Sequence, residues 1–206
     1  MSHPSGEWVA ASPQEPDEAI WLSRAQGGER GAFDELVRRH QREIFAVALR
    51  MLGSRDEAEE VAQDAFVRAY RALGSFRREA KLSTWLVSIT MNLCRNRRRW
   101  WARRRQVIVA SLDDPVDTEE GGIGHEVADP APTPAAMAQQ REEREQLAAA
   151  LQCLSDADRM VIVLRDVQGY AYEEIAQILD CRLGTVKSRI NRARLALRAV
   201  LDGRLR

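Results

Sequence analysis

The chain has 206 residues, and its 31 Lys plus Arg balance 31 Asp plus Glu, so the formal net charge at neutral pH is zero. This balance excludes a uniformly basic nucleic-acid-binding protein, and any polyanion-binding surface must come from charge that is segregated along the chain. No stretch has the apolar length that spans a bilayer, and the three cysteines lie far apart without a CxxC pair. The sequence therefore predicts neither direct membrane insertion nor a disulfide framework nor a zinc site.

The charge is segregated into blocks. Residues 18–105 carry 19 basic and 11 acidic side chains, residues 106–145 carry 2 and 10, and residues 146–206 carry 10 and 7. Residues 1–17 lack a cationic start followed by an apolar run and are predicted to be a disordered leader rather than a signal peptide. Unpaired cysteines without metal-ligand spacing are typical of a reducing compartment, so we expect a cytoplasmic protein.

Three amphipathic segments predict an all-helical domain over residues 18–105. The middle segment follows Ser54, which forms a capping box with Glu57, and its apolar residues recur at spacings of three and four. The segment before it ends at Gly53, and the segment after it is expected to have Ser83 as its N-cap.

Residues 106–140 contain the stretch DDPVDTEEGGIGHEVADPAPTP, whose proline, glycine and acid content cannot support a core. They are predicted to form a flexible acidic linker. A coil of about 35 residues has a root-mean-square span of roughly 30 to 35 Å, the length of about ten base pairs of duplex. Two modules joined in this way can reach neighbouring sites on one nucleic acid.

Residues 141–206 predict a second small helical domain. Ser155 and Asp158 form a capping box before RMVIVLRDV, a run with strand-like β-branching that its cap and its helical flanks favour as a helix. The segments YEEIAQILD and TVKSRINRARLALRAVL, joined by the tight CRLG, predict a helix-turn-helix with the small Ala176 at the crossing and Thr185 as the cap of the second helix. The apolar seam between its helices is expected to comprise Ile175, Leu179, Val186 and Ile190.

Two cationic segments indicate contact with nucleic acid. The second helix of the helix-turn-helix presents Arg and Asn side chains, whose paired hydrogen-bonding atoms match guanine and adenine in the major groove. A solvated surface helix is the alternative, but the turn, the small crossing residue and the cap favour DNA binding. The segment NLCRNRRRWWARRR has seven arginines, more than a helix dipole explains, and this density favours phosphate contact.

Three motifs, in order along the chain, are EEVAQDAFVRAYRALGSFR, STWLVSITMNLCRNRRR and YEEIAQILDCRLGTVKSRINRAR. They resemble those of bacterial RNA polymerase sigma factors of the sigma-70 family, in the extracytoplasmic function (ECF) subfamily. The resemblance covers about residues 18–105 and 146–200. It implies an all-α fold in which a sigma region 2 domain and a helix-turn-helix sigma region 4 domain are joined by the acidic linker, without domains one and three of larger sigma factors.

The resemblance also implies a function. Such a factor binds core RNA polymerase at the β′ clamp helices, directs it to promoters and promotes strand opening. Region 4 then reads the minus 35 element, with backbone contact from the helix that precedes the helix-turn-helix. The implied minus 35 contacts are Arg165, Lys187, Ser188, Arg189, Asn191 and Arg192.

Region 2 is implied to bind both polymerase and the minus 10 element. The loop over residues 76–82 would hold a flipped base, although the residues alone leave open whether Phe76 belongs to the pocket rim or to the core; Trp85 is assigned to the core. The implied minus 10 contacts are Phe76, Arg77, Arg78, Lys81, Asn92, Arg95 and Asn96. The implied polymerase contacts are Glu60, Gln63, Asp64 and Arg68.

Two other classes of function compete with this interpretation. A stand-alone helix-turn-helix regulator would need a ligand pocket or phosphoacceptor in the first domain, which instead carries the arginine-dense segment. An enzyme is disfavoured because the three histidines are scattered and no phosphate-binding glycine loop or nucleophile motif occurs. We therefore expect no catalytic residues, no cofactor and no metal. The expected partners are core RNA polymerase, promoter DNA and an anti-sigma factor.

Overall fold

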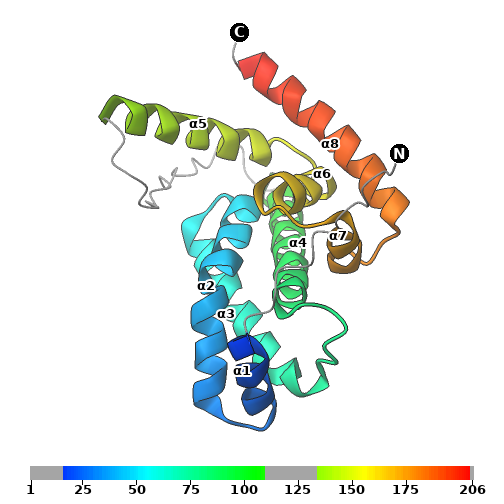
Figure 1. Cartoon of the computed structure of the whole chain (residues 1–206). Coiled ribbons are helices and arrows are strands. Elements are labelled where there is room, and N and C mark those ends of the chain that lie inside the picture. Colours follow the sequence, from blue (N-terminus) through cyan, green and yellow to red (C-terminus); the bar gives the residue numbers. More distant parts are fainter. Residues whose placement is uncertain (1–15, 110–133, 205–206) are drawn as a thin grey trace, which may run out of the picture.

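The computed structural model describes residues 16–109 and 134–204 (Figure 1). Every regular element in these residues is helical, and the predicted all-α class is confirmed. The elements are α1 (Pro16–Gln26), α2 (Arg30–Leu52), α3 (Arg55–Ala72), the 3-10 turn η1 (Leu73–Ser75), α4 (Leu82–Val109), α5 (Pro134–Gln152), α6 (Asp156–Ile162), the π-helical turn η2 (Val163–Val167), α7 (Tyr172–Ile178) and α8 (Leu183–Arg204).

Helices extend into both segments that were predicted to lack structure. α1 begins at Pro16, within the predicted leader, while α4 continues to Val109 and α5 starts at Pro134, within the predicted linker. Proline suits the first turn of a helix because its missing N–H would have no intrahelical partner there. The rest of the predicted leader and linker lies outside the described residues, at 1–15 and 110–133.

The first unit consists of α1 to α4. At the junction between α2 and α3, the helices end and begin where the sequence predicts. α2 ends at Gly53, whose φ of 78° and N–H bond to the Leu49 carbonyl form a left-handed helix cap. Ser54 directly afterwards caps α3, its hydroxyl accepting the Glu57 N–H at 3.4 Å. The predicted break between the two helices is confirmed.

Two predicted N-caps are wrong, because they lie inside their helices. α4 begins at Leu82, one residue before Ser83, and α8 begins at Leu183, two residues before Thr185. Leu82 is almost completely buried, so packing rather than a hydroxyl cap determines where α4 starts. At α8 the N–H of Thr185 bonds to the carbonyl of Arg182 at 2.9 Å, which places Thr185 in the first helical turn.

The second unit consists of α5 to α8. Ser155 caps α6 as predicted: its hydroxyl accepts the Asp158 N–H at 3.2 Å and donates to the Asp158 carboxylate at 2.7 Å. The β-branched run is helical, as predicted, but its second half is the wider turn η2, closed by a bond from the Gln168 N–H to the Val163 carbonyl. Gly169, with a φ of 77°, then turns the chain toward α7.

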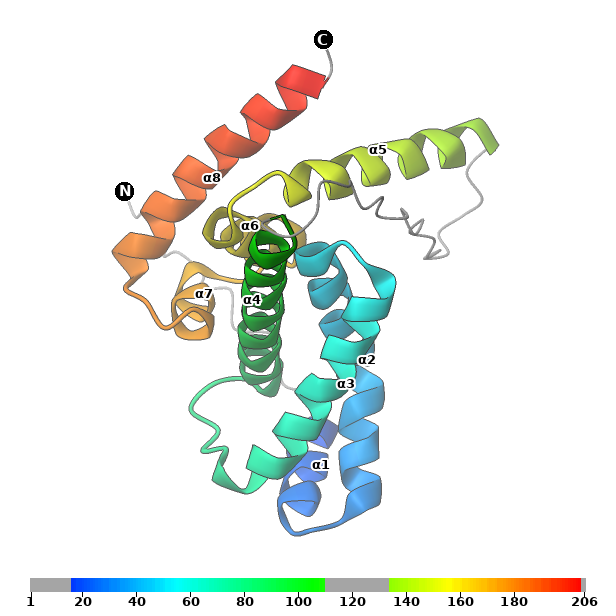
Figure 2. The same cartoon turned by 180° about the vertical axis from the view of Figure 1, so that it is seen from behind.

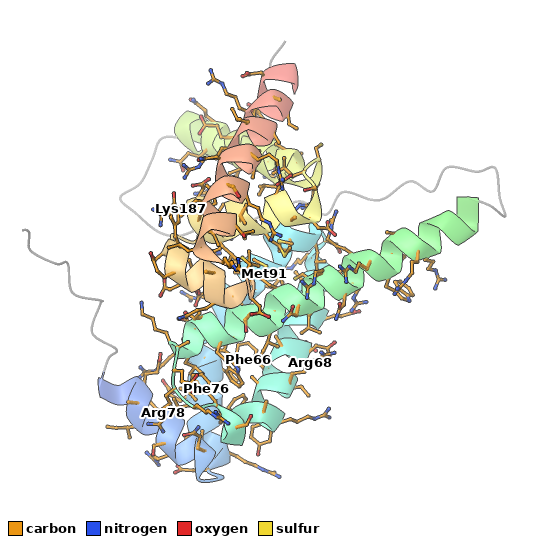
Figure 3. The ribbon with its side chains drawn as sticks, turned by 90° about the vertical axis from the view of Figure 1, so that its right-hand side faces the viewer. Phe66, Arg68, Phe76, Arg78, Met91 and Lys187 are labelled. Carbon is orange, nitrogen blue, oxygen red and sulfur yellow. The ribbon has the colours of Figure 1, made fainter. Side chains whose placement is uncertain are left out.

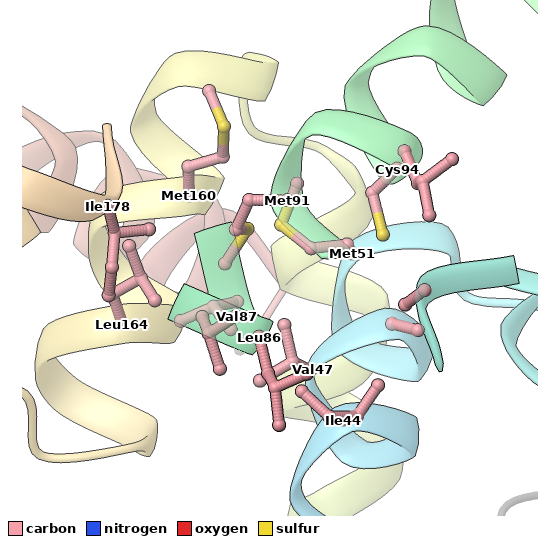
Figure 4. Packing of buried hydrophobic residues seen from close by; sticks show 14 of the residues in the cluster. Ile44, Val47, Met51, Leu86, Val87, Met91, Cys94, Met160, Leu164 and Ile178 are labelled. Atoms are coloured by element: carbon pink, nitrogen blue, oxygen red, sulfur yellow. The ribbon is translucent and has the colours of Figure 1, made fainter. Parts of the chain in front are cut away.

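The two units pack against each other along α4 (Figure 2). Met51 of α2, Met91 of α4 and Met160 of α6 belong to one buried cluster that continues to Leu164 and Ile178 (Figure 4). The sequence predicts a separate core for each domain, whereas in the structure the two cores merge into one continuous core. Unbranched methionine side chains adapt to irregular gaps, which suits a surface between two separately patterned units.

Buried polar groups also join the units, at the end of α2. Arg159 is fully buried, and its guanidinium donates to the Met51 carbonyl at 2.7 Å and to three carbonyls at the end of α5 and in the turn after it. The amide of Gln152 donates to the Arg50 carbonyl at 3.1 Å. Because the last carbonyls of a helix have no donor within it, these side chains cap α2 from the second unit.

Candidate nucleic-acid interface

α7 and α8 form the predicted helix-turn-helix. Ile175, Val186 and Ile190 are buried at the seam, and Leu179 packs against it half-buried, as predicted. Asp180 begins the turn with a φ of 47°, a left-handed conformation that Asp tolerates better than most residues. The seam buries one side of α8 and leaves the opposite side open.

The open side of α8 carries part of the predicted minus 35 set. Lys187, Ser188 and Asn191 are exposed near the N-terminal end of the helix. Figure 3 shows Lys187 there. Residues four apart lie one above the other on a helix, so Lys187 and Asn191 form one row. Arg189 and Arg165 are half-buried instead, and Arg165 donates to a carbonyl of its own unit.

Arg192 is positioned by an acid of α6. Its Nε and Nη2 both donate to Oδ1 of Asp158, at 3.2 and 2.9 Å, while its side chain stays 64% exposed. Burial raises the pKa of Asp158, but hydrogen bonds from Ser155 and Arg192 outweigh burial and hold this pKa below its ordinary value. The charged carboxylate uses two of the five guanidinium N–H groups, and the other three are available to a ligand.

The predicted base-binding loop is organised by Gln26, which the sequence did not single out. Its side-chain nitrogen donates to the carbonyls of Leu73 and Phe76, at 3.0 Å each, and its oxygen accepts from Arg78 at 2.8 Å. Phe76 stacks on Trp85 with 4.7 Å between ring centroids, and both rings are half-buried against the core. Phe76 therefore packs on the core, and its place at the rim of a base-binding pocket stays a prediction.

Two of the predicted minus 10 side chains of α4, Asn92 and Arg95, face the second unit. Asn92 and Asn96 are exposed one turn apart, and Arg95 donates to Asn92 Oδ1 at 2.7 Å while its buried Nε has no partner among the described residues. Lys81 pairs with Glu174 of α7 at 3.0 Å, and Arg77 is exposed. A cavity of about 390 Å³ separates Asn92 and Arg95 from α6 and α7, where it is lined by Met160, Ile178, Leu179 and Asp180.

The outer side of α3 carries the predicted polymerase-binding set. All four members are exposed: Glu60, Gln63, Asp64 and Arg68. Val67 lies among them and is 48% exposed, but it is not one of the predicted contacts. A groove of about 490 Å³ adjoins Val67 and is lined by Phe33, Phe66 and Tyr70, so the surface is amphipathic rather than purely polar. In the sequence, the sign of this apolar part was Val67, an apolar residue among the polar residues on the outer side of α3.

Neither a metal centre nor a membrane span occurs in the part of the chain that the structure describes. Residues 16–109 and 134–204 contain no cluster of three or more His, Cys, Asp or Glu arranged to hold a metal ion. No helix there combines the length and the apolarity that crossing a membrane requires.

Comparison with known proteins identifies both helical units. Residues 36–105 match the family model of Sigma-70 region 2, and residues 144–197 match that of Sigma-70, region 4. The RNA polymerase sigma-H factor of Pseudomonas aeruginosa PAO1 is 36% identical over 194 residues, which are 94% of this chain and 97% of the relative. The ECF RNA polymerase sigma-E factor of Escherichia coli K12 is 36% identical over 178 residues, which are 86% of this chain and 91% of the relative.

Two solved structures share the fold. CnrH, in complex with the cytosolic domain of CnrY, has a TM-score of 0.61 and 26% identity and covers 91% of this chain and 98% of its own. The sigma factor RpoE of Bartonella quintana, in complex with the anti-sigma factor NepR, has a TM-score of 0.62 and 26% identity and covers 82% and 96%. The two matched regions lie within the two helical units and contain all the predicted contact residues. The chain therefore belongs to the sigma-70 family of RNA polymerase sigma factors, in the ECF subfamily.

Proposed function

We propose that this ECF sigma factor binds core RNA polymerase, directs it to specific promoters and promotes strand opening. The observation that carries the proposal is the presence of regions 2 and 4, in that order, in one chain, each with an exposed polar surface suited to its role. The activity then consists of positioning polymerase on DNA, with no catalytic residue of its own, and it takes place in the cytoplasm.

Run-off transcription tests this function. Purified core polymerase on genomic promoter fragments is expected to make RNA with defined 5′ ends only when the protein is added. A stand-alone helix-turn-helix regulator would bind such fragments without polymerase and would not confer promoter-specific initiation on core enzyme. DNA binding without promoter-specific initiation by core polymerase would therefore contradict the proposal.

In the proposed minus 35 complex the open side of α8 enters the major groove. Lys187, Ser188, Asn191 and Arg192 then reach base edges, because residues at the N-terminal end of a recognition helix lie closest to the groove floor. Asp158 holds the guanidinium of Arg192 from behind, which reduces the side-chain entropy lost on binding. Arg165 and Arg189, both half-buried, support the surface and contact the sugar-phosphate backbone.

We expect Arg192→Ala to weaken minus 35 recognition by about 1 to 3 kcal/mol and to relax base preference at one position, because a paired Arg contact carries that much discrimination. Selection of promoters from a randomised minus 35 library by the variant holoenzyme measures this preference. Arg198→Ala is the control, since Arg198 is exposed on the same helix but lies nearer its C-terminal end. An unchanged base preference for Arg192→Ala would refute the assignment.

In the proposed open complex the loop over 76–82 holds an unpaired base, and Asn92 and Asn96 bind the non-template strand. Amide groups can pair with exposed base edges, and cations along the loop neutralise phosphates. Because Asn92 and Arg95 face α7 and Lys81 pairs with Glu174, the second unit has to move away from α4 before the strand can bind.

The outer side of α3 is the proposed contact with the β′ clamp helices. Asp64→Arg reverses a charge at its centre and is expected to lower the affinity for core polymerase at least tenfold, since like charges placed in an interface cost free energy. Competition for core polymerase against labelled wild-type protein measures the loss. Glu142→Arg, an equal charge reversal on the exposed part of α5, is the control. If both variants compete equally well, the outer side of α3 is not the surface that docks on polymerase.

An anti-sigma factor is a proposed partner in addition to polymerase. The support is the similarity to RpoE of Bartonella quintana, whose solved structure contains the anti-sigma factor NepR. A partner of this kind would act by stabilising the arrangement in which α7 covers the minus 10 side of α4.

A further inference from the structure

A single side chain of α1, Gln26, holds the first part of the loop over residues 76–82. Its side-chain nitrogen donates to the carbonyls of Leu73 and Phe76, and its side-chain oxygen accepts from Nη2 of Arg78. These partners lie 47 to 52 positions further along the chain. An amide group carries two donor hydrogens and an acceptor oxygen, so one side chain serves all three groups.

Arg78 has a backbone conformation that needs this support. Its φ is 60°, and only Arg78 and Asp180 combine a side chain with a positive φ in the part of the chain that the structure describes. This left-handed conformation costs free energy because Cβ lies too close to the backbone. The bond to Gln26 stabilises it, while the exposed guanidinium of Arg78 keeps further donors for a phosphate (Figure 3).

Gln26 is itself fixed by the end of α1. It is the last residue of this helix and is half-buried. The N–H groups of the two residues after it donate to carbonyls of the last turn of α1, at 3.0 Å each. Arg24 then binds Glu29 through two guanidinium groups, with 2.7 Å for the Nε bond. The amide of Gln26 therefore has a defined position before the loop meets any ligand.

The loop beyond Phe76 offers its backbone to a ligand. The N–H and carbonyl groups of residues 77–80 make no backbone hydrogen bond within residues 16–109 and 134–204. Backbone groups of this kind bond to water until another polar partner replaces it. An unpaired base presents its donors and acceptors in a fixed pattern along one edge. The base that fits such a loop thus depends on where these groups point, and therefore on the φ of Arg78.

We propose that Gln26 is a positioning residue for minus 10 recognition, which determines, through the conformation of the loop, which flipped base the loop accepts. The inference rests on the proposed sigma function. It adds a residue that lies outside the predicted DNA contacts and acts through them. A loop that is shaped before binding loses less conformational entropy when the base enters, and it also rejects bases whose edge does not match.

The two ties of the loop differ in the proposed open complex. At its far end Lys81 pairs with Glu174 of α7 at 3.0 Å, and this pair breaks when the second unit moves away from α4. Gln26 belongs to the same unit as the loop, so its three bonds do not depend on the second unit. Gln26 therefore keeps the loop in shape when the unpaired base arrives.

Promoter selection tests the proposal. Holoenzyme is assembled with wild-type protein, Gln26→Met, Gln26→Glu or Gln41→Met. Each holoenzyme selects promoters from one library randomised in the minus 10 element and from a second library randomised in the minus 35 element. Gln41→Met is the matched control, because it makes the same substitution at an exposed glutamine of α2, outside the proposed surfaces.

Gln26→Met is expected to reduce the preference for the favoured base at one minus 10 position about tenfold, the size of a lost base contact. Preferences at the other minus 10 positions and in the minus 35 element are expected to stay as in wild type. Gln26→Glu keeps an acceptor for Arg78 but loses both donors, so its preference should lie between those of Gln26→Met and wild type. Gln41→Met should match wild type throughout.

A purely structural role of Gln26 gives a different result. A smaller folded fraction reduces binding to all promoters alike, so it cannot change the preference at one position. Wild-type preference at every minus 10 position for Gln26→Met would therefore overturn the inference. So would weaker competition for core polymerase at an unchanged base preference, because Gln26 would then serve polymerase docking. Failure of wild-type holoenzyme to initiate in run-off transcription would instead refute the sigma function.

Discussion

Arg159→Met is expected to lower the free energy of unfolding by about 3 kcal/mol, because it leaves buried carbonyls without donors. The Arg159 side chain is fully buried, and its donors bond to the carbonyls of Leu151 at 2.6 Å and of Met51 and Gln152 at 2.7 Å. Burial, together with the neighbouring Arg98, lowers the pKa of Arg159 to about 10, so the guanidinium remains charged at neutral pH. Methionine fills similar space but offers none of these donors.

Urea unfolding at neutral pH measures this loss. Arg159→Lys is expected to unfold between wild type and Arg159→Met, because an ammonium keeps the charge but cannot spread its donors as a planar fork does. Arg165→Met is the control, since Arg165 is only half-buried and its guanidinium donates to the carbonyl of Tyr170 rather than to a set of buried carbonyls. An Arg159→Met variant that unfolds at the wild-type urea midpoint would show that the carbonyls find other partners.

The same substitution also tests whether Arg159 holds the two units together. Met51 belongs to the first unit, whereas the three other carbonyls that Arg159 binds belong to the second unit, at the end of α5 and in the turn after it. Losing the bond to Met51 should therefore loosen the contact between the units as well as the second unit itself. Small-angle scattering at neutral pH is expected to give a larger radius of gyration for Arg159→Met than for Arg165→Met.

Local signals predicted the helical elements well. Ser54 and Ser155 cap their helices, and the helix-turn-helix seam is buried at Ile175, Val186 and Ile190, because capping and periodicity depend on residues three or four positions apart. Ser83 and Thr185 show the limit of such signals. A serine or threonine near a helix start can occupy the cap or the first turn, and burial of the flanking leucine decided this at α4.

Contacts between distant segments were not predictable from the sequence. Gln26 organises a loop some fifty residues later, and Arg159 donates to the carbonyl of Met51, 108 residues earlier, in the last turn of α2. Neither has a local signature, since a buried polar side chain looks like an exposed one until its partners are placed. Val67 was missed for the converse reason: an isolated apolar residue in a polar row is more often neutral than part of a binding surface.

The stability of the protein is expected to fall by about 3 kcal/mol between pH 6 and pH 9, because of one buried histidine. His40 Nε2 lies 3.2 Å from Glu18 of α1, and its Nδ1 lies 3.7 Å from Glu43 of α2. Burial lowers the pKa of His40, but hydrogen bonds and charges of both glutamates outweigh burial and raise it from 6.5 to about 9. Tyr170, from the second unit, donates to Glu43 at 2.6 Å and completes the cluster.

The direction of the effect follows from proton binding. The folded protein holds the His40 proton more tightly than the unfolded chain, so this stabilisation is complete below pH 6.5 and is lost as the pH rises toward 9. Both glutamates have lowered pKa values and stay ionised throughout this range. Their carboxylates therefore contribute nothing to the slope, and the histidine alone determines it within this cluster.

Urea unfolding of wild type and His40→Gln at pH 6, 7, 8 and 9 tests this assignment. The variant is expected to be less stable at pH 6 and to show little change up to pH 9, where the two proteins converge. Burial raises the pKa of Cys94 to about 12, which would also reduce stability toward high pH, but both proteins contain this thiol and the difference between them removes its effect. Glu18→Gln should shift the wild-type decline to lower pH, because it removes one of the two charges that hold the proton. Parallel curves for wild type and His40→Gln would show that the imidazole is neutral in the folded protein and that the ion cluster does not form.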